Sequence, residues 1–451
     1  MNAPLMISVA GVRGIVGQSL TPPVLTRFVA AFAAELPPGD VVVGRDARKS
    51  GPMVYRAVAA GLMAAGRGVI DLGLATTPAT QIAVEELRAS GGIILTASHN
   101  PREWNALKFL SSRGEFLDAE TGRRVKARYE AGEGSWASVD GLGNERAEAR
   151  ADEWHIARVL SMSSLDVEAI RRRGLKVAVD GCASVGGVAV PKLLRALGAS
   201  VVELDCEPNG DFTRELEPLP ENLGALGRVV RESGADFGIA VDPDADRAAL
   251  VDERGAPLGE EYTVALGADV VLARTPGPAV TNLSTSRMLD AVCQRAGVPL
   301  HRSPVGEAHV VGLMRSCGAV VGGEGNGGMI VPEVHYGRDS LVAAALIGQA
   351  LTANAMSLRT LADRLPKLVM VKEKTGRSQE PWEAAASRLE VAFKGFETDN
   401  QDGMRFSRGD DWVHVRPSGT EPVVRLIAES TSDGRTRELI EAARHALLGT
   451  S

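Results

Sequence analysis

Three short apolar runs give way abruptly to small and polar residues, and this repeated pattern constrains the fold more than any other feature. The runs end in the sequences ILTASHNP, around Ser98, IAVDPDADR, around Asp244, and VVGGEGNGG, around Asn326. Each run belongs to an alternation of short β-rich segments with longer helical patterns, which predicts βαβ units and parallel or mixed sheets. Ligands of open α/β sheets bind beyond the carboxyl ends of strands. We therefore expect repeated α/β domains whose loops face one cleft.

A chain of 451 residues is too long for one compact domain and suits three or four. From about residue 367 the pattern changes to four strands and two helices, which is typical of a small α+β domain. The predicted fold class is α/β, with three similar mixed-sheet domains and a smaller C-terminal α+β domain around a central cleft. The predicted domains are 1–150, 151–253, 254–366 and 367–451.

Composition excludes several classes of function. The formal charge is −7 and the basic residues are scattered, so we expect no nucleic-acid partner. The segment 341–356 is apolar but short for a bilayer and is interrupted by Gln349, so it indicates a buried helix and no membrane association. No signal peptide is apparent. The four cysteines lack CxxC spacing, which favours reduced thiols; they are Cys182, Cys206, Cys293 and Cys317. We expect a cytoplasmic monomer or homodimer.

The segment DPDADR is the strongest local signal. Asp242, Asp244 and Asp246 alternate, so their carboxylates can converge from one turn onto a hard divalent cation. A calcium EF-hand is excluded because Arg247 stands at its sixth position, where that loop needs Gly, and both flanks resemble strands. A solvated acidic turn is the alternative, but it offers no compensation for the repulsion of three carboxylates.

Ser98 lies at the end of an apolar run, beside His99. It can be an activated nucleophile, a phosphorylated residue whose phosphate joins the aspartates on a metal ion, or a simple turn or cap. The surroundings do not fit the G-x-S-x-G motif of serine hydrolases. Ten residues on, Lys108 is either an ordinary solvated side chain or a group that acts as acid/base or holds a transferring phosphoryl group.

The segment RPSGTEP predicts a phosphate-binding loop. Guanidinium forks, hydroxyl groups and backbone N–H groups form the predicted cradle, which consists of Arg416, Ser418, Gly419, Thr420 and, further on, Arg425. The segment is not a Walker A loop. A tight surface turn is the alternative.

Two weaker motifs complete the set. Glu324 and Asn326 combine a carboxylate with an amide in a glycine-rich loop, which suits vicinal sugar hydroxyls. Near the N-terminus, GVRG predicts a tight loop that delivers Arg13.

Together these motifs resemble the α-D-phosphohexomutase superfamily, and they occur in its order along nearly the whole chain. The residues that carry the resemblance are Ser98 in TASHNP, Asp242, Asp244 and Asp246 in DPDADR, Glu324 and Asn326 in GEGNGG, and Arg416 to Thr420 in RPSGTEP. The resemblance implies a phosphorylated Ser98, with Mg²⁺ bound by its phosphate and the three aspartates. It also implies that His99 and Lys108 are acid/base candidates, Arg13 and Arg247 are active-site cations, Glu324 and Asn326 bind the sugar, and the RPSGTEP loop binds the unreactive phosphate.

The implied reaction interconverts hexose 6-phosphate and hexose 1-phosphate through a bound hexose 1,6-bisphosphate. NPREWNALKF and GEGNGG look most like one branch of the phosphoglucosamine mutases, so glucosamine phosphate is the expected substrate and mannose or glucose phosphate the alternative. Glucose- and mannose-specific members often end the sugar loop with Ser-Gly-His, where this chain has Asn326-Gly-Gly. The role of that histidine is vacant, or it passes to His309 or His335. A metal-dependent sugar phosphatase, a sugar-phosphate sensor and a bisphosphate synthase are the competing functions.

Overall fold

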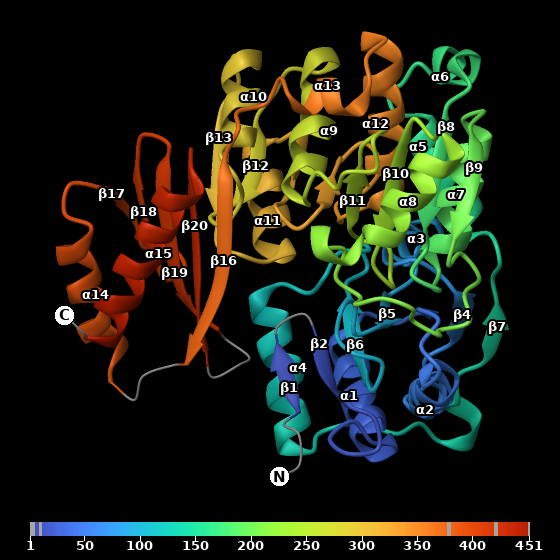
Figure 1. Cartoon of the computed structure of the whole chain (residues 1–451). Coiled ribbons are helices and arrows are strands. Elements are labelled where there is room, and N and C mark those ends of the chain that lie inside the picture. The colour runs from blue at the N-terminus through green and yellow to red at the C-terminus, as the bar shows by residue number, and fades with distance from the viewer. Residues whose placement is uncertain (1–4, 9–10, 377–379, 419–422, 450–451) are drawn as a thin grey trace.

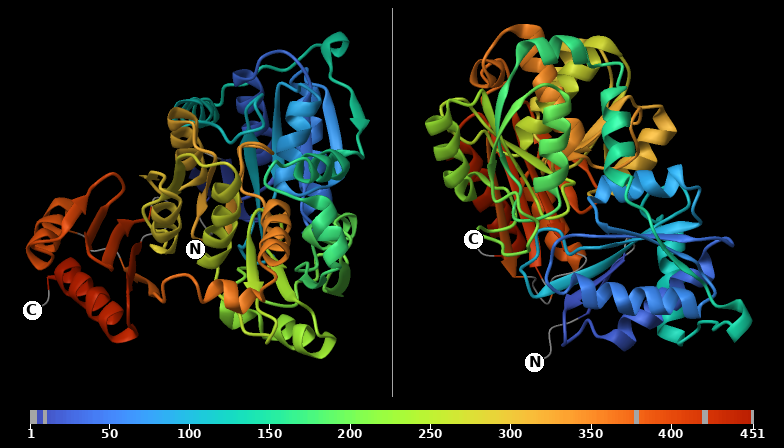
Figure 2. Two further views of the ribbon diagram at one scale, coloured as in Figure 1. Left: turned by 90° about the horizontal axis from the view of Figure 1, so that it is seen from above. Right: turned by 90° about the vertical axis from the view of Figure 1, so that its right-hand side faces the viewer.

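Four β-sheets follow one another along the chain in the computed structural model, which describes residues 5–8, 11–376, 380–418 and 423–449. Figure 1 shows the C-terminal sheet beside the third unit, connected through the segment that leads into β16. The left view of Figure 2, seen from above, shows the C-terminal sheet on the same side of the third unit. The predicted mixed α/β architecture is confirmed. Each sheet lies inside one of the predicted domain ranges, whereas the boundaries themselves stay a prediction.

The first unit contains a seven-stranded sheet with the order β1-β2-β6-β5-β3-β4-β7. Its strands are β1 (Met6–Ser8), β2 (Gly11–Ile15), β3 (Val41–Arg45), β4 (Val69–Leu74), β5 (Gly91–Leu95), β6 (Trp104–Leu110) and β7 (Glu145–Ala147). Its helices are α1 (Pro22–Glu35), α2 (Gly51–Ala64), α3 (Thr77–Glu86), α4 (Ala119–Ala131) and the 3₁₀ turn η1 (Val139–Gly141). Strands β3, β4, β5 and β7 pair in parallel, and β6 and β2 extend the sheet antiparallel.

The second and third units each contain a four-stranded sheet, in which the last strand pairs antiparallel with its neighbour. The second comprises α5 (Ala151–Leu160), α6 (Val167–Arg173), β8 (Lys176–Asp180), α7 (Gly186–Ala196), β9 (Ser200–Leu204), η2 (Pro220–Asn222), α8 (Gly224–Ser233), β10 (Phe237–Val241) and β11 (Ala248–Val251). The third comprises α9 (Glu261–Arg274), β12 (Ala279–Asn282), α10 (Met288–Ala296), β13 (Leu300–Ser303), α11 (Glu307–Cys317), β14 (Val321–Glu324), β15 (Gly328–Ile330), α12 (Ser340–Asn354) and α13 (Leu358–Ala362).

The fourth unit is a five-stranded antiparallel sheet with the order β16-β20-β19-β18-β17. Its elements are β16 (Val369–Gly376), α14 (Trp382–Ala392), β17 (Glu397–Asp399), β18 (Met404–Arg408), β19 (Asp411–Pro417), β20 (Val423–Ser430) and α15 (Asp433–Leu448).

The apolar core joins the second and third units but leaves the fourth separate. Helix α12 is buried almost all round, as its continuous apolar sequence predicts, and it packs against α7 of the second unit and α9 of the third. The fourth unit has its own cluster, built around Leu389, Phe406 and Leu426. The fourth unit is therefore the part of the chain that is least tied to the rest by apolar packing.

The three special loops lie where the sequence places them, at the carboxyl ends of β5, β10 and β14. One local prediction is wrong. Arg13 does not lie on a tight loop, because GVRG forms β2 and pairs with both β1 and β6.

Within the described residues, no helix combines the length and apolar character needed to cross a bilayer. All four cysteines are free thiols, and Cys182, Cys206 and Cys293 are buried.

Gly327 provides a test of how the second and third units are joined. Its φ is +83° and its carbonyl accepts the Ala248 N–H, while an added Cβ would lie 2.3 Å from the Ala248 carbonyl oxygen. Gly174 has a similar φ of +60° but open space around it, so Gly174→Ala isolates the backbone strain, worth about 1 kcal/mol. We expect Gly327→Ala to lower the free energy of unfolding by at least about 1 kcal/mol more than Gly174→Ala, because the clash adds to the strain. Equal losses in urea unfolding followed by circular dichroism would contradict this close contact.

Candidate active site

Ser98 is presented by a strained turn directly after β5. Its φ is +48°, which is uncommon for a residue other than glycine, and its side chain is 7% exposed. The Ser98 N–H donates to the Thr96 hydroxyl at 2.9 Å, and the Thr96 hydroxyl donates to Asp46 Oδ2 at 2.6 Å. Strain of this kind persists only where the surroundings enforce it, and it is typical of active sites.

Arg48 is the residue that enforces this turn. Its buried guanidinium pairs with Asp46 at 3.0 Å and donates to the carbonyl groups of four residues in and after the turn, namely Ser98, Asn100, Pro101 and Trp104. Neither Arg48 nor Asp46 was identified from the sequence as a site residue. The only available signal was the Gly-Arg-Asp sequence that ends β3.

The three aspartates of DPDADR converge after β10. Asp242, Asp244 and Asp246 are all fully buried, and each offers a carboxylate oxygen within 4.8 Å of the others. The side chain of Ser98 joins them, because its Oγ donates to Asp242 Oδ2 at 2.8 Å. A serine from the first unit and the acidic loop of the second therefore meet without any change of conformation.

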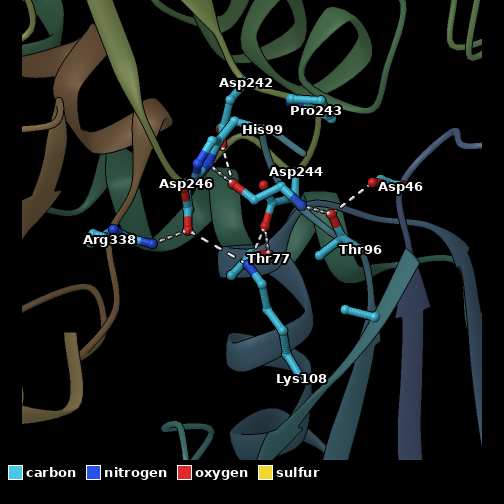
Figure 3. Close-up of polar contacts among 12 residues, drawn as sticks. Asp46, Thr77, Thr96, His99, Lys108, Asp242, Pro243, Asp244, Asp246 and Arg338 are labelled. Carbon is cyan, nitrogen blue, oxygen red and sulfur yellow. Dashed lines mark hydrogen bonds and ion pairs between the residues drawn. The ribbon is translucent and has the colours of Figure 1, made fainter. Parts of the chain in front are cut away.

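Cations and hydroxyl donors from the first and third units surround the aspartates (Figure 3). Lys108 Nζ and the Thr77 hydroxyl both donate to Asp244 Oδ2 at 2.7 Å. From the third unit, Arg338 Nη2 donates to Asp246 Oδ2 at 2.5 Å. The adjacent Arg247 lies 3.7 Å from Asp246, and its guanidinium also reaches Glu217 at 3.3 Å.

The crowding of carboxylates changes their proton affinities in opposite directions. Burial, together with the negative charges of Asp244 and Asp246, raises the pKa of Asp242 well above its usual value. Burial would also raise the pKa of Asp244, but the Lys108 ammonium and the hydrogen bonds from Lys108 and Thr77 hold it below its usual range. Burial opposes the charge on Lys108, yet the two facing aspartates raise the pKa of its ammonium overall. Lys108 is thus held as a cation.

The residues fit a divalent metal ion. Asp244 Oδ1 and Asp246 Oδ1 are buried and have no hydrogen-bond partner among the described residues. Hard cations such as Mg²⁺ and Ca²⁺ take carboxylate oxygens as ligands, and a cation would offset the repulsion that raises the pKa of Asp242.

His99 follows Ser98 and faces the basic side of the site. Its Nδ1 lies 3.4 Å from Ser98 Oγ. Burial, helped by the positive charges of Arg247 and Arg13, lowers the pKa of His99 to about 2. Arg13 reaches the same turn from β2, where its Nη1 donates to Asn100 Oδ1 at 3.1 Å.

The carboxylate of Glu324 lies at the end of β14 and is 3% exposed. Its Oε1 accepts from Asn282 Nδ2 at 2.8 Å and from the Gly306 N–H at 2.9 Å. Its Oε2 accepts from Arg338 Nη1 at 2.8 Å. The half-buried Asn326 turns its Oδ1 back to the Gly328 N–H, so it stabilises the glycine-rich loop itself.

Arg338 links the acidic loop to the sugar loop and was missed in the sequence. Its guanidinium contacts Asp246, Glu324 and Glu307 within 2.9 Å. Arg338 is part of a second Gly-Arg-Asp sequence, like the one that precedes Arg48. Because all three contacts are buried carboxylates, Arg338 fixes the distance between the two loops.

The phosphate-binding loop is described only in part, since Gly419 and Thr420 lie outside the described residues. Arg416 and Arg425 face each other across the β19–β20 pair, and Ser418 follows directly. Arg416 Nε contacts Asp402 Oδ2 at 3.0 Å, and the same oxygen accepts the Val305 N–H of the third unit at 3.0 Å. Val305 precedes Gly306, which donates to Glu324, so this chain of contacts links the fourth unit to the sugar loop.

Two histidines, His309 and His335, are offered by the sequence as replacements for the histidine that the loop after β14 lacks, and they differ in position. His335 is buried, and its Nε2 lies 3.0 Å from Asp339 Oδ2, a carboxylate that His155 also contacts. His309 is exposed on the first turn of α11, beside Gly306. Of the two, only His309 is exposed, and it lies beside Gly306, whose N–H donates to Glu324.

Comparisons with known proteins agree with this arrangement. Domain families described as phosphoglucomutase/phosphomannomutase alpha/beta/alpha domains I, II and III and C-terminal domain match residues 6–135, 154–255, 259–369 and 368–446. The chain is 37% identical over 439 residues to a phosphoglucomutase/phosphomannomutase of Thermococcus kodakarensis, with 96% of each chain covered. It is 36% identical over 436 residues to a probable phosphoglucosamine mutase of Methanopyrus kandleri, with 95% of each covered. The crystal structure of a phosphoglucomutase/phosphomannomutase family protein from Burkholderia thailandensis has a TM-score of 0.86 at 28% identity, with 98% of each chain covered.

Arg48→Lys tests the support of the Ser98 turn. A lysine keeps the charge but cannot reach five acceptors at once, so the turn loses its enforced geometry. We expect enzymatic turnover to fall about 100-fold, because displacing a reacting group by about 1 Å costs that much. Arg113→Lys, at an exposed arginine of the same unit, is the matched control and keeps full turnover. Unchanged kinetics in Arg48→Lys would contradict this role, because the Ser98 turn would then keep its geometry without the Arg48 contacts.

Proposed function

The chain belongs to the α-D-phosphohexomutase superfamily, and we propose that it isomerises hexose phosphates through a phosphorylated Ser98. The membership makes it an intramolecular phosphotransferase. The observation that carries the proposal is the 2.8 Å contact between Ser98 Oγ and Asp242, which places a nucleophilic oxygen against three buried carboxylates.

In the proposed reaction, phosphoserine 98 transfers its phosphoryl group to the free hydroxyl of a hexose 1- or 6-phosphate. The Oγ–P bond breaks as an O–P bond to the sugar oxygen forms, and the proton that the sugar hydroxyl loses is balanced by the one that Ser98 Oγ gains. The product is a bound hexose 1,6-bisphosphate. After it turns end for end, the other phosphoryl group returns to Ser98 and the isomerised monophosphate leaves.

The charges around Ser98 suit this transfer. Phosphoryl transfer is catalysed mainly by positioning and by charge stabilisation. We propose that Lys108 stabilises the transferring group as a permanent cation, since the two aspartates raise the pKa of its ammonium. Arg247 and Arg13 supply further positive charge on the side of His99. With a pKa of about 2, His99 is neutral at pH 7 and can accept a hydrogen bond from an incoming hydroxyl, but it holds a proton only weakly.

Ser98, as its phosphate, and Asp242, Asp244 and Asp246 are the proposed ligands of Mg²⁺. When bound, this ion would neutralise charge on the phosphoryl oxygens. The residues of the chain do the rest: Thr77 and Lys108 orient Asp244, while Arg338 orients Asp246. Such orientation of ligands by their neighbours is needed for a defined metal geometry.

The opposite end of the substrate would lie between the third and fourth units. We propose that Glu324 and Asn326 bind sugar hydroxyls and that the RPSGTEP loop holds the phosphate that is not reacting. The proposed phosphate ligands are Arg416, Ser418, Gly419, Thr420 and Arg425. The contact of Arg416 with Asp402 supports this role, because it shows an arginine oriented at the end of β19 that leads into the loop.

Glucosamine phosphate is the proposed sugar. Several relatives that are at least 30% identical and covered almost completely are named probable phosphoglucosamine mutases. Mannose or glucose phosphate is the alternative, since another relative at 37% identity is named a phosphoglucomutase/phosphomannomutase. Turnover of the three sugar phosphates, started with a catalytic amount of hexose bisphosphate, distinguishes glucosamine phosphate from the mannose or glucose alternative. We expect glucosamine phosphate to have the largest kcat/KM, and a larger value for either other sugar would overturn this assignment.

Ser98→Ala tests the phosphoserine directly. Intact-mass analysis of the active enzyme should show one phosphate, which the variant lacks. We expect the variant to retain sugar-phosphate binding and to lose turnover by at least about 10⁴-fold, because the nucleophile is gone. Thr96→Ser, which keeps the neighbouring hydroxyl, is the control.

The phosphatase alternative predicts a different result in the same assay. A phosphatase would release inorganic phosphate in proportion to the sugar phosphate consumed, without isomerisation. An active enzyme that behaves this way, or one that carries its phosphate at another residue, would contradict the proposed function.

A further inference from the structure

A hollow of about 430 Å³ lies between the third and fourth units, and its lining includes neither the acidic loop nor Arg416. It is lined by the start of α10 and by the end of β18 with the loop before β17. The strand register shows which end of the sheet this is: Arg408 pairs with Asp411, whereas Met404 pairs with Val415, next to Arg416. The hollow thus adjoins the end of the β18–β19 pair that is opposite the phosphate-binding loop.

Arg405 is the most unusual residue in the wall of the hollow. It is 8% exposed, and its guanidinium stacks on the ring of Trp412, with 4.8 Å between its central carbon and the ring centroid. Its buried Nε has no hydrogen-bond partner, and within the described ranges its guanidinium forms no ion pair. Burial, with a contribution from the positive charge of Arg302, lowers the pKa of Arg405 to about 9. A buried, unpaired cation is costly unless a negative group satisfies it.

Two further arginines face the same hollow. Arg287, just before α10, and Arg408, whose guanidinium lies 4.3 Å from the Phe396 ring centroid, line it together with Arg405. Neither Arg287 nor Arg408 forms an ion pair within the part of the chain that the structure describes. Arg287 comes from the third unit and the other two from the fourth, so a ligand that contacts all three would connect the units.

Nearby acidic groups do not neutralise these arginines. Asp290 lines the hollow, but it is paired with Arg302 Nη2 at 2.6 Å. Glu429 Oε1 accepts from Trp412 Nε1 at 2.8 Å and from the Arg287 N–H at 2.9 Å. It therefore holds the stacked ring and the third unit together. Glu397, the other acidic residue of the lining, is exposed at the rim. Asp411, which pairs with Arg408 across the strands, already accepts from Ser430 Oγ and Arg435 Nε.

We propose that this hollow is a second anion site, which binds a small phosphate monoester between the third and fourth units. Guanidinium groups match the oxygens of a phosphate in pairs, and Ser407 adds a hydroxyl to the wall. The volume falls in the range typical of small-molecule sites and exceeds what inorganic phosphate needs, which favours an organic phosphate. A bound phosphate would join Arg287 to Arg405 and Arg408, and so restrain the fourth unit against the third.

Ligand binding in the hollow can be followed by the fluorescence of Trp412, because the Arg405 guanidinium stacks on the Trp412 ring. The probe is glycerol 2-phosphate, a monoester that is not a hexose, titrated into the complete enzyme while tryptophan fluorescence is recorded. We expect a saturable change in the wild-type protein that disappears in Trp412→Phe. Arg405→Gln should weaken binding about tenfold or more, since it removes a charge-assisted hydrogen bond. Arg408→Gln, at an exposed position where folding is not at risk, should also weaken it severalfold.

Two controls separate this site from the active site and from general charge effects. Arg416→Gln removes the proposed active-site phosphate ligand and should leave the Trp412 signal unchanged. Arg437→Gln removes one exposed charge on α15 of the same unit and should also leave it unchanged. In the absence of the probe, Arg405→Gln should be no less heat-stable than the wild type, because it removes an unpaired buried charge. The proposal fails if both Arg405→Gln and Arg408→Gln bind the probe like the wild type, or if Arg416→Gln alone abolishes the signal.

Discussion

The repulsion among three fully buried carboxylates is the constraint that organises this molecule. Asp242, Asp244 and Asp246 lie too close together to remain ionised without compensation. The compensation comes from different parts of the chain: Lys108 and Thr77 from the first unit, and Arg338 from the third. Since two of these groups are charged and all are held at hydrogen-bond distance, the acidic loop also fixes how three units meet. The active centre and the joint between the units are the same structure.

Two arginines position the remaining parts of the site. Arg48 imposes an unfavourable backbone conformation on Ser98 by binding four carbonyl groups of its turn, and so aims the hydroxyl at Asp242. Arg338 connects the acidic loop to Glu324, and so keeps a fixed separation between the loops that follow β10 and β14. The fourth unit is different, because it has its own core and meets the third unit mainly through polar contacts such as Asp402 with Val305. A ligand bound between these two units would therefore stabilise the contact between units that has the least apolar packing.

Much of the fold and the centre of the site follow from local sequence patterns. Apolar runs ending in polar loops locate the strands that carry Ser98, Asp244 and Glu324, because burial and turn formation are local properties. Arg13 was assigned to a loop because two glycines suggested a turn, yet strand pairing with β1 and β6 prevailed. Arg48 and Arg338 could not be identified, since a buried arginine is recognised only by acceptors that lie far away in sequence. The same limit applies to Arg405, whose environment depends on Trp412 and on the third unit.

We infer that Ser98 and the three aspartates form one metal-binding centre. Mn²⁺ can replace Mg²⁺ in such oxygen-ligand sites and scatters anomalously, so diffraction from Mn²⁺-soaked crystals locates the bound ion directly. We expect one strong anomalous peak within about 2.5 Å of carboxylate oxygens of Asp242, Asp244 and Asp246, on the side of Ser98. A peak bound elsewhere, with the three aspartates still held only by Lys108, Thr77 and Arg338, would contradict it.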